Sequence, residues 1–170
     1  LETKRKNFIK LGNIMINIKK NLIDKKITIP KSSQPLANYN PYTLSNNLVF
    51  VSGQIPIIKG EIIYKGKIGH EISIIDGIKA SKICILNTFS VLSLALDGNL
   101  NQIKKCLKLT VFINSNDNFY DQPKIADGAS DLLKTILYPY GEHSRSAVST
   151  NSLPKNASVE IDSIFEINIE

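Results

Sequence analysis

The stretch that decides the fold is GEHSRSAVSTNSLPKNASVEIDSIFE, residues 141–166. β-Branched and polar residues alternate in 146–150 and again in 159–167, and the turn formers of 153–156 lie between the two runs. Alternation of this kind, interrupted by proline and asparagine, predicts two short strands joined as a β-hairpin.

One arginine, Arg145, stands at the start of the first run, and the only other arginine of the chain is Arg5. A guanidinium can bind a planar carboxylate through two parallel hydrogen bonds, which a lysine cannot do. Glu160 and Asp162 are two residues apart in the second run, so both are expected on one face of that strand. The pattern leaves two interpretations open, an internal salt bridge or the two halves of a site for a small anion.

Composition indicates one domain. A chain of 170 residues with 42% hydrophobic and 21% charged residues is typical of a single soluble core. Residues 1–31 hold nine Lys or Arg against two acids, so they account for the whole net charge of +6 and leave the remainder at −1. A basic leader can bind nucleic acid but is more commonly solvated, and a nearly neutral body argues against a nucleic-acid partner.

We expect residues 1–14 to be a disordered or non-native extension and residues 15–170 to form one domain that begins with a short helix at about 15–26. No run has the length of a membrane span and no signal sequence precedes the body, which indicates a cytoplasmic protein without a membrane partner.

Cysteine and histidine usage argues against a metal site. Cys84 and Cys106 lie in apolar segments, which favours buried free thiols of a reducing compartment over a disulfide or a reactive pair. His70 and His143 do not have the spacing of zinc ligands with them.

The order of elements predicts an α+β fold. An apolar strand at 48–51 ends at Ser52-Gly53, and a more exposed strand bends around Lys59-Gly60. Apolar residues at helical spacing predict a helix over about 71–96 and another whose stripe runs over 125–137, with a strand at 105–114 between them. Two helices packed on one face of a mixed sheet account for this order.

Four motifs stand out along the chain: ANY-x-P at 37–41, LVFVSGQIP at 48–56, DQPK-x-x-DGASDLL at 121–133 and HSRSAV…LP…VEIDSIFEI over 143–167. Together they resemble the reactive intermediate deaminase family, also called the YjgF or endoribonuclease L-PSP family, in its longer-chain branch. The resemblance covers the chain from about residue 15 to its end.

This resemblance implies a chorismate-mutase-like fold, a homotrimer with clefts at the subunit interfaces, and hydrolysis of enamines and imines such as 2-aminoacrylate to a 2-keto acid and ammonia. It implies no metal and no cofactor. It assigns the substrate carboxylate to Arg145 and the acid that positions water to Asp162, one methylene shorter than the usual glutamate. The substrate-binding positions that it implies are Tyr39, Ser52, Ala147 and Asp127, the last of which stands where an asparagine is common.

Two other functions stay open. The first is a trimer that binds small carboxylates without turning them over. The second is an endoribonuclease or translation inhibitor, which the older family name implies and which the nearly neutral body with its one arginine favours poorly.

Overall fold

The structure is a computed structural model that describes residues 16–30 and 38–168. The predicted extension 1–14 and the first residue of the ANY-x-P motif lie outside the described residues. The elements are α2 (Ile18–Asp24), β1 (Tyr42–Ser45), β2 (Leu48–Gln54), β3 (Ile57–Ile58), β4 (Glu61–Ile62), α3 (Ile74–Ala95), β5 (Ile103–Asn114), α4 (Gln122–Ile136), β6 (Ser144–Thr150) and β7 (Val159–Ile167).

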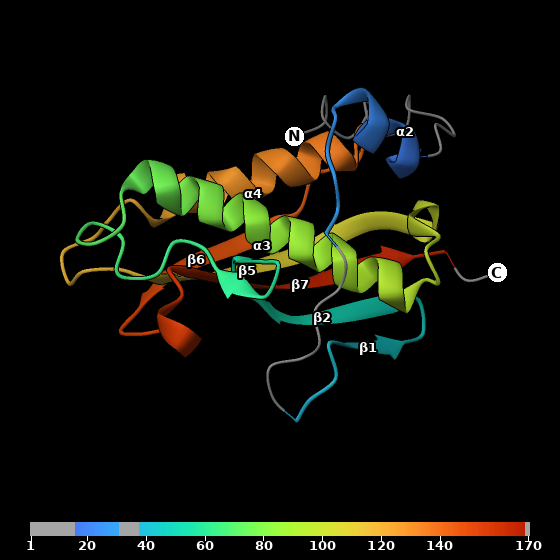
Figure 1. Cartoon of the computed structure of the whole chain (residues 1–170). Helices are drawn as coiled ribbons and strands as arrows, with labels where there is room; N and C mark the ends of the chain where they lie inside the picture. Colours follow the sequence, from blue (N-terminus) through green and yellow to red (C-terminus); the bar gives the residue numbers. More distant parts are fainter. Residues whose placement is uncertain (1–15, 31–37, 169–170) are drawn as a thin grey trace, which may run out of the picture.

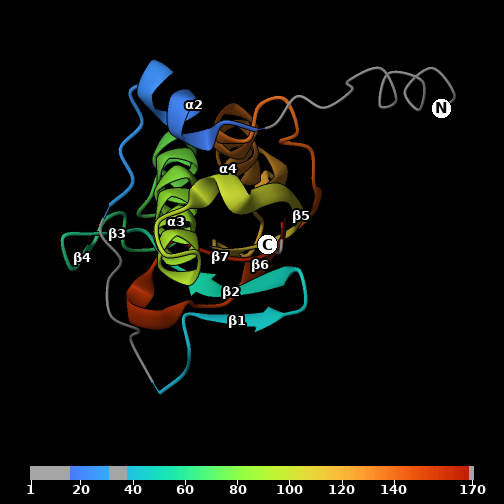
Figure 2. The ribbon, with the colours of Figure 1, turned by 90° about the vertical axis from the view of Figure 1, so that its right-hand side faces the viewer.

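One five-stranded sheet has the order β1-β2-β7-β5-β6, and β3 pairs with β4 in a separate small hairpin. β6 runs parallel to β5 and every other neighbouring pair of the sheet is antiparallel, so the sheet is mixed. Helices α3 and α4 cover one face of it, and no helix of the described chain covers the other (Figures 1 and 2). The predicted mixed sheet with two helices on one face is thereby confirmed.

The core lies between this helical layer and the sheet. In β7 every second residue, from Val159 to Ile167, is buried, which is the alternation that the sequence shows. The rings of Phe89 in α3 and Phe165 in β7 meet edge to face with their centroids 6.0 Å apart. Ser73 caps α3 by accepting a hydrogen bond from the backbone N–H of Asp76, which explains why the helix begins three residues later than predicted.

Helix α2 lies at the end of α4 and is shorter than the helix predicted at 15–26. Its Asn21 fastens it there, because Nδ2 donates to the carbonyl oxygens of Ile136 at 2.9 Å and Tyr138 at 3.1 Å. The basic segment 1–31 therefore contains a helix that belongs to the folded body.

Helices α3 and α4 approach closely at Gly128. A Cβ built there would lie 2.5 Å from the backbone oxygen of Ile78 and 2.5 Å from Oγ of Ser81. Oγ of Ser81 also lies 2.8 Å from the carbonyl oxygen of Ile125, so a hydrogen bond crosses the same contact.

Gly128→Ala is therefore expected to destabilise the protein, although alanine is the better helix former by about 1 kcal/mol. Overpacking a rigid backbone contact costs about 1–3 kcal/mol, which exceeds this gain. Denaturant unfolding would measure the loss, with Asp131→Ala at an exposed position of the same helix as the control. A stabilised Gly128→Ala variant would show that the two helices can separate freely.

The prediction of a hairpin over residues 141–166 is wrong. β6 and β7 do not pair, because β5 lies between them in the sheet. Closeness in sequence favours pairing of the two strands, but the connection 151–158 is long enough to pass over the end of one strand, a span of about 10 Å between second neighbours.

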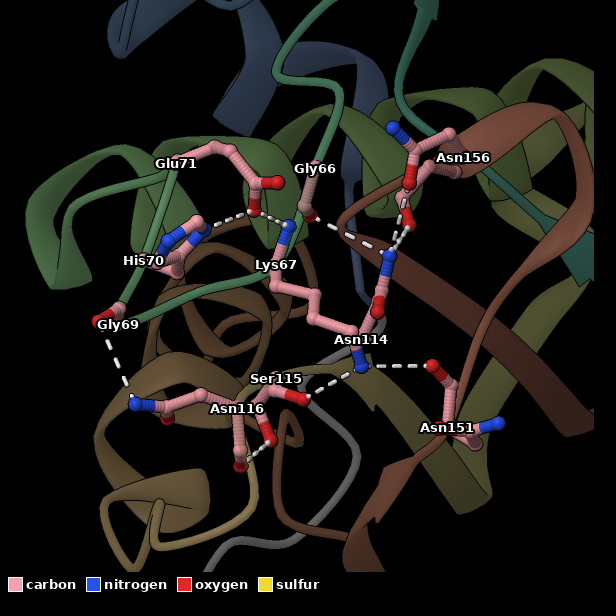
Figure 3. A network of polar contacts seen from close by, with 11 residues as sticks. Gly66, Lys67, Gly69, His70, Glu71, Asn114, Ser115, Asn116, Asn151 and Asn156 are labelled. Atoms are coloured by element: carbon pink, nitrogen blue, oxygen red, sulfur yellow. Dashed lines mark hydrogen bonds and ion pairs between the residues drawn. The ribbon is translucent and has the colours of Figure 1, made fainter.

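A polar network holds this connection across the end of β5 (Figure 3). Nδ2 of Asn114, the last residue of β5, lies 3.2 Å from the carbonyl oxygen of Ala157 and 3.3 Å from Oδ1 of Asn156. Nζ of Lys67 donates to the carbonyl oxygen of Asn151 at 2.7 Å. The side chains of Asn114 and Lys67 thus hold a long crossing connection in place, where a hairpin would have a tight turn.

Strand β1 was not predicted. It pairs with β2 through the turn at Asn46-Asn47, and Asn46 has a positive φ of 51°. Two asparagines between the β-prone runs YTLS and LVFV are a hairpin signal that could have found it.

Both cysteines are buried and free, as predicted. Burial raises the pKa of the Cys84 thiol well above its ordinary value, and burial also raises that of Cys106 to about 12, so neither is a reactive thiolate. By length and composition α3 could cross a membrane, but half of its most apolar window is buried inside this fold. Its apolar character is that of a core helix.

Candidate functional site

The register of the sheet fixes which face each predicted site residue occupies. Leu109 of β5 is opposite Arg145 on one side and Ser163 on the other, and all three lie on the face that the helices cover. The next residue, Thr110, is opposite Asp162, and these two lie on the open face. Arg145 and Asp162 of one chain are therefore on opposite faces and cannot meet.

The guanidinium of Arg145 is held from the side of α4. Its Nη1 donates to Oδ1 of Asp127 at 2.9 Å and to Oγ of Ser130 at 2.9 Å. The Arg145 side chain is 22% exposed and that of Asp127 is 58% exposed. The internal salt bridge considered for Glu160 or Asp162 does not form, because the partner of Arg145 is Asp127.

This ion pair engages only the Nη1 nitrogen of the guanidinium. A guanidinium has five N–H donors, and the two on Nη1 are the ones that Asp127 and Ser130 use. Within the described chain no hydrogen bond is formed by Nε or Nη2 of Arg145. These two nitrogens form one edge of the planar group, which is the edge that takes a carboxylate through two parallel bonds. Ala147 follows two residues later on the same face.

A second group of predicted residues gathers on the other side of the sheet, around the end of β2. Oγ of Ser52 donates to the carbonyl oxygen of Asn40 at 2.8 Å, and the backbone N–H of Ser52 donates to that of Pro41 at 3.0 Å. Tyr39 precedes these two residues and is 45% exposed. The segment that carries Tyr39 is thus fixed beside the Ser-Gly-Gln end of the strand.

Glu160 belongs to this second group, and the sequence did not single it out as the functional acid. A Cβ on Gly53 would lie 2.0 Å from Oε1 of Glu160, so this carboxylate rests on the backbone of Gly53 itself. Glu160 is half-buried and, in the described chain, has no ion pair. Burial raises its pKa, and the negative charge of Asp162 raises it further.

The structure therefore brings the predicted residues together in two groups. Arg145, Asp127 and Ala147 lie together at β6 and α4. Tyr39 and Ser52 lie together at β2, with Glu160, and Asp162 lies beyond Glu160 on the same open face. Among the described residues no three His, Cys, Asp or Glu side chains form a group that could hold a metal ion.

The sequence matches the family described as "YjgF/chorismate_mutase-like, putative endoribonuclease" over residues 19–166. This match spans most of the chain, which therefore belongs to that family, as the resemblance indicated.

Individual relatives agree with this assignment. The chain is 36% identical over 145 residues to protein TCP17 of Trypanosoma cruzi, covering 84% of this chain and 89% of that protein. It is 28% identical over 142 residues to a 2-iminobutanoate/2-iminopropanoate deaminase of Dermatophagoides farinae, covering 83% and 94%. The crystal structure of protein Atu1372 from Agrobacterium tumefaciens superposes with a TM-score of 0.82 at 39% identity, over 89% of this chain and 92% of that one.

Proposed function

We propose that this protein is a deaminase that hydrolyses small 2-imino acids and their enamine tautomers, such as 2-aminoacrylate, to a 2-keto acid and ammonia. The observation that carries the proposal is the half-buried guanidinium of Arg145. Its Nη1 is paired with Asp127 and Ser130, and its Nε–Nη2 edge has no hydrogen-bond partner in the described chain. The similarity to a named imine deaminase supports the same reaction class.

The chemistry asked of the protein is modest. Arg145 holds the substrate carboxylate, and a carboxylate side chain orients a water molecule and takes its proton as the oxygen bonds to the imine carbon. The carboxylate passes this proton to the nitrogen and then carries the hydroxyl proton of the tetrahedral adduct to it as well, so that ammonia leaves, a C=O group remains and the carboxylate is ionised again. An imine needs no electron sink for this reaction, so we propose that no cofactor takes part.

Geometry favours Glu160 over Asp162 as this carboxylate. Glu160 lies against Gly53 and close to Ser52, whereas Asp162 is one pleat farther along the open face. A raised pKa also suits a group that must both accept and return a proton. The assignment of Asp162 by resemblance stays a prediction, and exchanging either acid for its amide separates the two.

Because Arg145 and Glu160 of one chain lie on opposite faces of its sheet, we propose that the complete site forms between two copies of a homotrimer. The open face supports assembly, since Phe50 is 39% exposed and Val148 is 47% exposed there. A copy that covers this face could bring its own Arg145 to the Glu160 of its neighbour. We place the assembly in the cytoplasm, where its buried thiols stay reduced.

The test of the function is the hydrolysis of 2-iminopropionate, generated in the assay from alanine by an amino-acid oxidase. The protein is expected to accelerate the loss of the imine above the rate in buffer, with pyruvate and ammonia as products. Pyruvate binding in calorimetry without any acceleration would instead assign the protein to carboxylate binding. RNA cleavage by the purified protein with no imine hydrolysis would favour the endoribonuclease alternative.

Mixed trimers test the shared site. Arg145→Ala and Glu160→Gln protomers are each expected to be nearly inactive, but an equal mixture refolded together should regain about a quarter of the wild-type activity, because one interface in four then combines both native residues. A mixture with no more activity than its components would show that no subunit interface combines the two residues.

Gly53→Ala is expected to abolish turnover while the fold survives. The added methyl group takes the place of the Glu160 carboxylate, and this flexible side chain can move away at small cost in stability. The expected loss of kcat is about 100-fold or more, the effect of misplacing a catalytic group. Thermal unfolding supplies the control, and an active Gly53→Ala variant would remove Glu160 from the mechanism.

A further inference from the structure

Two side chains behind Arg145 have no part in the reaction proposed above, and they make a connected chain of hydrogen bonds. We propose that Ser130 and His143 are positioning residues, which hold the guanidinium of Arg145 so that its Nε–Nη2 edge faces the incoming carboxylate. This inference rests on the proposed role of Arg145 as the carboxylate-binding residue.

The chain begins at a backbone carbonyl group. Nδ1 of His143 lies 2.9 Å from the carbonyl oxygen of Gly141, and Nε2 lies 2.9 Å from Oγ of Ser130. A carbonyl oxygen can only accept, so Nδ1 carries the ring proton and Nε2 of the neutral ring is the acceptor. The hydroxyl group of Ser130 therefore donates to His143, and its lone pairs are left for the N–H of Arg145 at 2.9 Å.

His143 gives the serine hydroxyl its direction. A serine inside a helix can otherwise donate to a carbonyl oxygen of the preceding turn, where its lone pairs would point elsewhere. With the hydroxyl proton committed to Nε2, Oγ becomes a fixed acceptor for Nη1 of Arg145. The ring acts on Arg145 only through Ser130, so its role is one of orientation.

Ser130 is the more rigid of the two anchors on Nη1. It lies three residues after Asp127 on α4, so both side chains point to the same side of the helix. Ser130 is only 6% exposed, whereas the Asp127 side chain is 58% exposed and its ion pair is correspondingly weak. An arginine that is immobilised before the ligand arrives loses less rotamer freedom on binding, and so it binds more tightly.

The charges around the ring agree with a neutral imidazole. Burial lowers the pKa of His143, and the positive charges of Arg145 and Lys134 lower it further, against an opposing hydrogen bond to the Gly141 carbonyl. The carboxylate of Asp127, on α4, is already paired with Arg145. The neutral ring keeps Nε2 as an acceptor, which the bond to Ser130 requires.

Arginine scarcity makes a direct test feasible. The chain has two arginines, Arg5 and Arg145, so the ¹⁵N NMR signals of the guanidinium groups are few, and an Arg5→Lys variant assigns them. In the ligand-free wild type we expect the side chain of Arg145 to be ordered, with separate Nη1 and Nη2 signals. Ser130→Ala should average these signals through faster rotation, without any requirement for turnover.

The histidine offers a matched pair of variants. His143→Asn keeps a donor for the Gly141 carbonyl but has no group at the place of Nε2, whereas His143→Gln can place its amide oxygen there. We expect Ser130→Ala and His143→Asn to weaken pyruvate binding and raise KM by about threefold to tenfold, the effect of one hydrogen bond. His143→Gln and Ser130→Thr should restore most of the loss, and kcat should change less than KM in every case.

These outcomes separate the two proposals. If the protein does not hydrolyse the imine, the NMR signals of Arg145 and the affinity for pyruvate still test the positioning. Signals of Arg145 that stay the same in Ser130→Ala and His143→Asn would overturn the inference, whatever the activity. Equal losses in His143→Asn and His143→Gln would also overturn it, since only the former removes the acceptor.

Discussion

Arg145→Lys is expected to reduce kcat/KM for imine hydrolysis by about 100-fold or more, because it removes two charge-assisted hydrogen bonds that contribute about 1.5–3 kcal/mol each. Lysine keeps the positive charge, so the loss measures the planar fork and not the charge alone. The ammonium group also cannot bind Asp127 and Ser130 in the geometry of Nη1 while it faces the substrate. Stability should fall by less than about 1 kcal/mol, since the Asp127 side chain of the ion pair is 58% exposed and lysine keeps the charge.

The steady-state hydrolysis of 2-iminopropionate and the calorimetric affinity for pyruvate measure this effect. Arg5→Lys is the matched control, because it makes the same exchange at the other arginine of the chain. If Arg145→Lys lowers kcat but leaves the affinity for pyruvate unchanged, the guanidinium acts on the transition state and not on the bound carboxylate. Full activity of Arg145→Lys would contradict the proposal that the Arg145 guanidinium binds the substrate carboxylate.

The elements that the sequence predicted well are those whose pattern is decided by burial. The alternation from Val159 to Ile167 predicted β7 with both of its ends, because one face of this strand is buried throughout. The long apolar segment that became α3 was clear for the same reason. Residue usage alone makes Arg145 a candidate, since a rare side chain in a lysine-rich protein indicates a need for its geometry, and its role in the site stays a prediction.

The errors concern relations between strands, which a local pattern does not contain. Closeness in sequence favoured pairing of β6 with β7. In the structure β5 lies between them, and the connection 151–158 crosses the end of β5, where the side chains of Asn114 and Lys67 hold it. With this pairing wrong, Arg145 and the acids of β7 were expected side by side and are in fact on opposite faces of the sheet. The register that decides this is a property of the whole sheet.

The choice between the two acids of β7 could not be made from the sequence either. A period of two places Glu160 and Asp162 on the same face, and the spacing favours neither. The distinction comes from the irregular register between Val51 and Gln54, which places Gly53 under the Glu160 carboxylate. A glycine after a strand predicts a close approach of the backbone, but not which side chain approaches it.

Glu160→Gln is expected to lower kcat by about 10²–10⁴-fold, the range of a lost general acid–base group, and at the same time to stabilise the protein at neutral pH. Burial and the charge of Asp162 raise the pKa of Glu160 in the folded state above its ordinary value near 4.5. The folded state therefore binds the proton more tightly than the unfolded state, and Glu160 favours folding most below pH 4.5. As the pH rises through the folded-state pKa this contribution is lost, and an ionised carboxylate stays in a half-buried place.

Glutamine carries no such charge, so the difference in free energy of unfolding between Glu160→Gln and wild type should be positive at pH 7 and shrink toward zero below about pH 4.5. Denaturant unfolding across this pH range, beside kcat at pH 7, measures both effects on one variant. Asp162→Asn is the matched control on the same face of β7 and should also lower the Glu160 pKa, while keeping far more activity. If Asp162→Asn abolishes turnover and Glu160→Gln does not, the water-positioning acid is Asp162. A Glu160→Gln protein that is inactive but no more stable at pH 7 would show that the folded state holds the ionised carboxylate without a cost in stability.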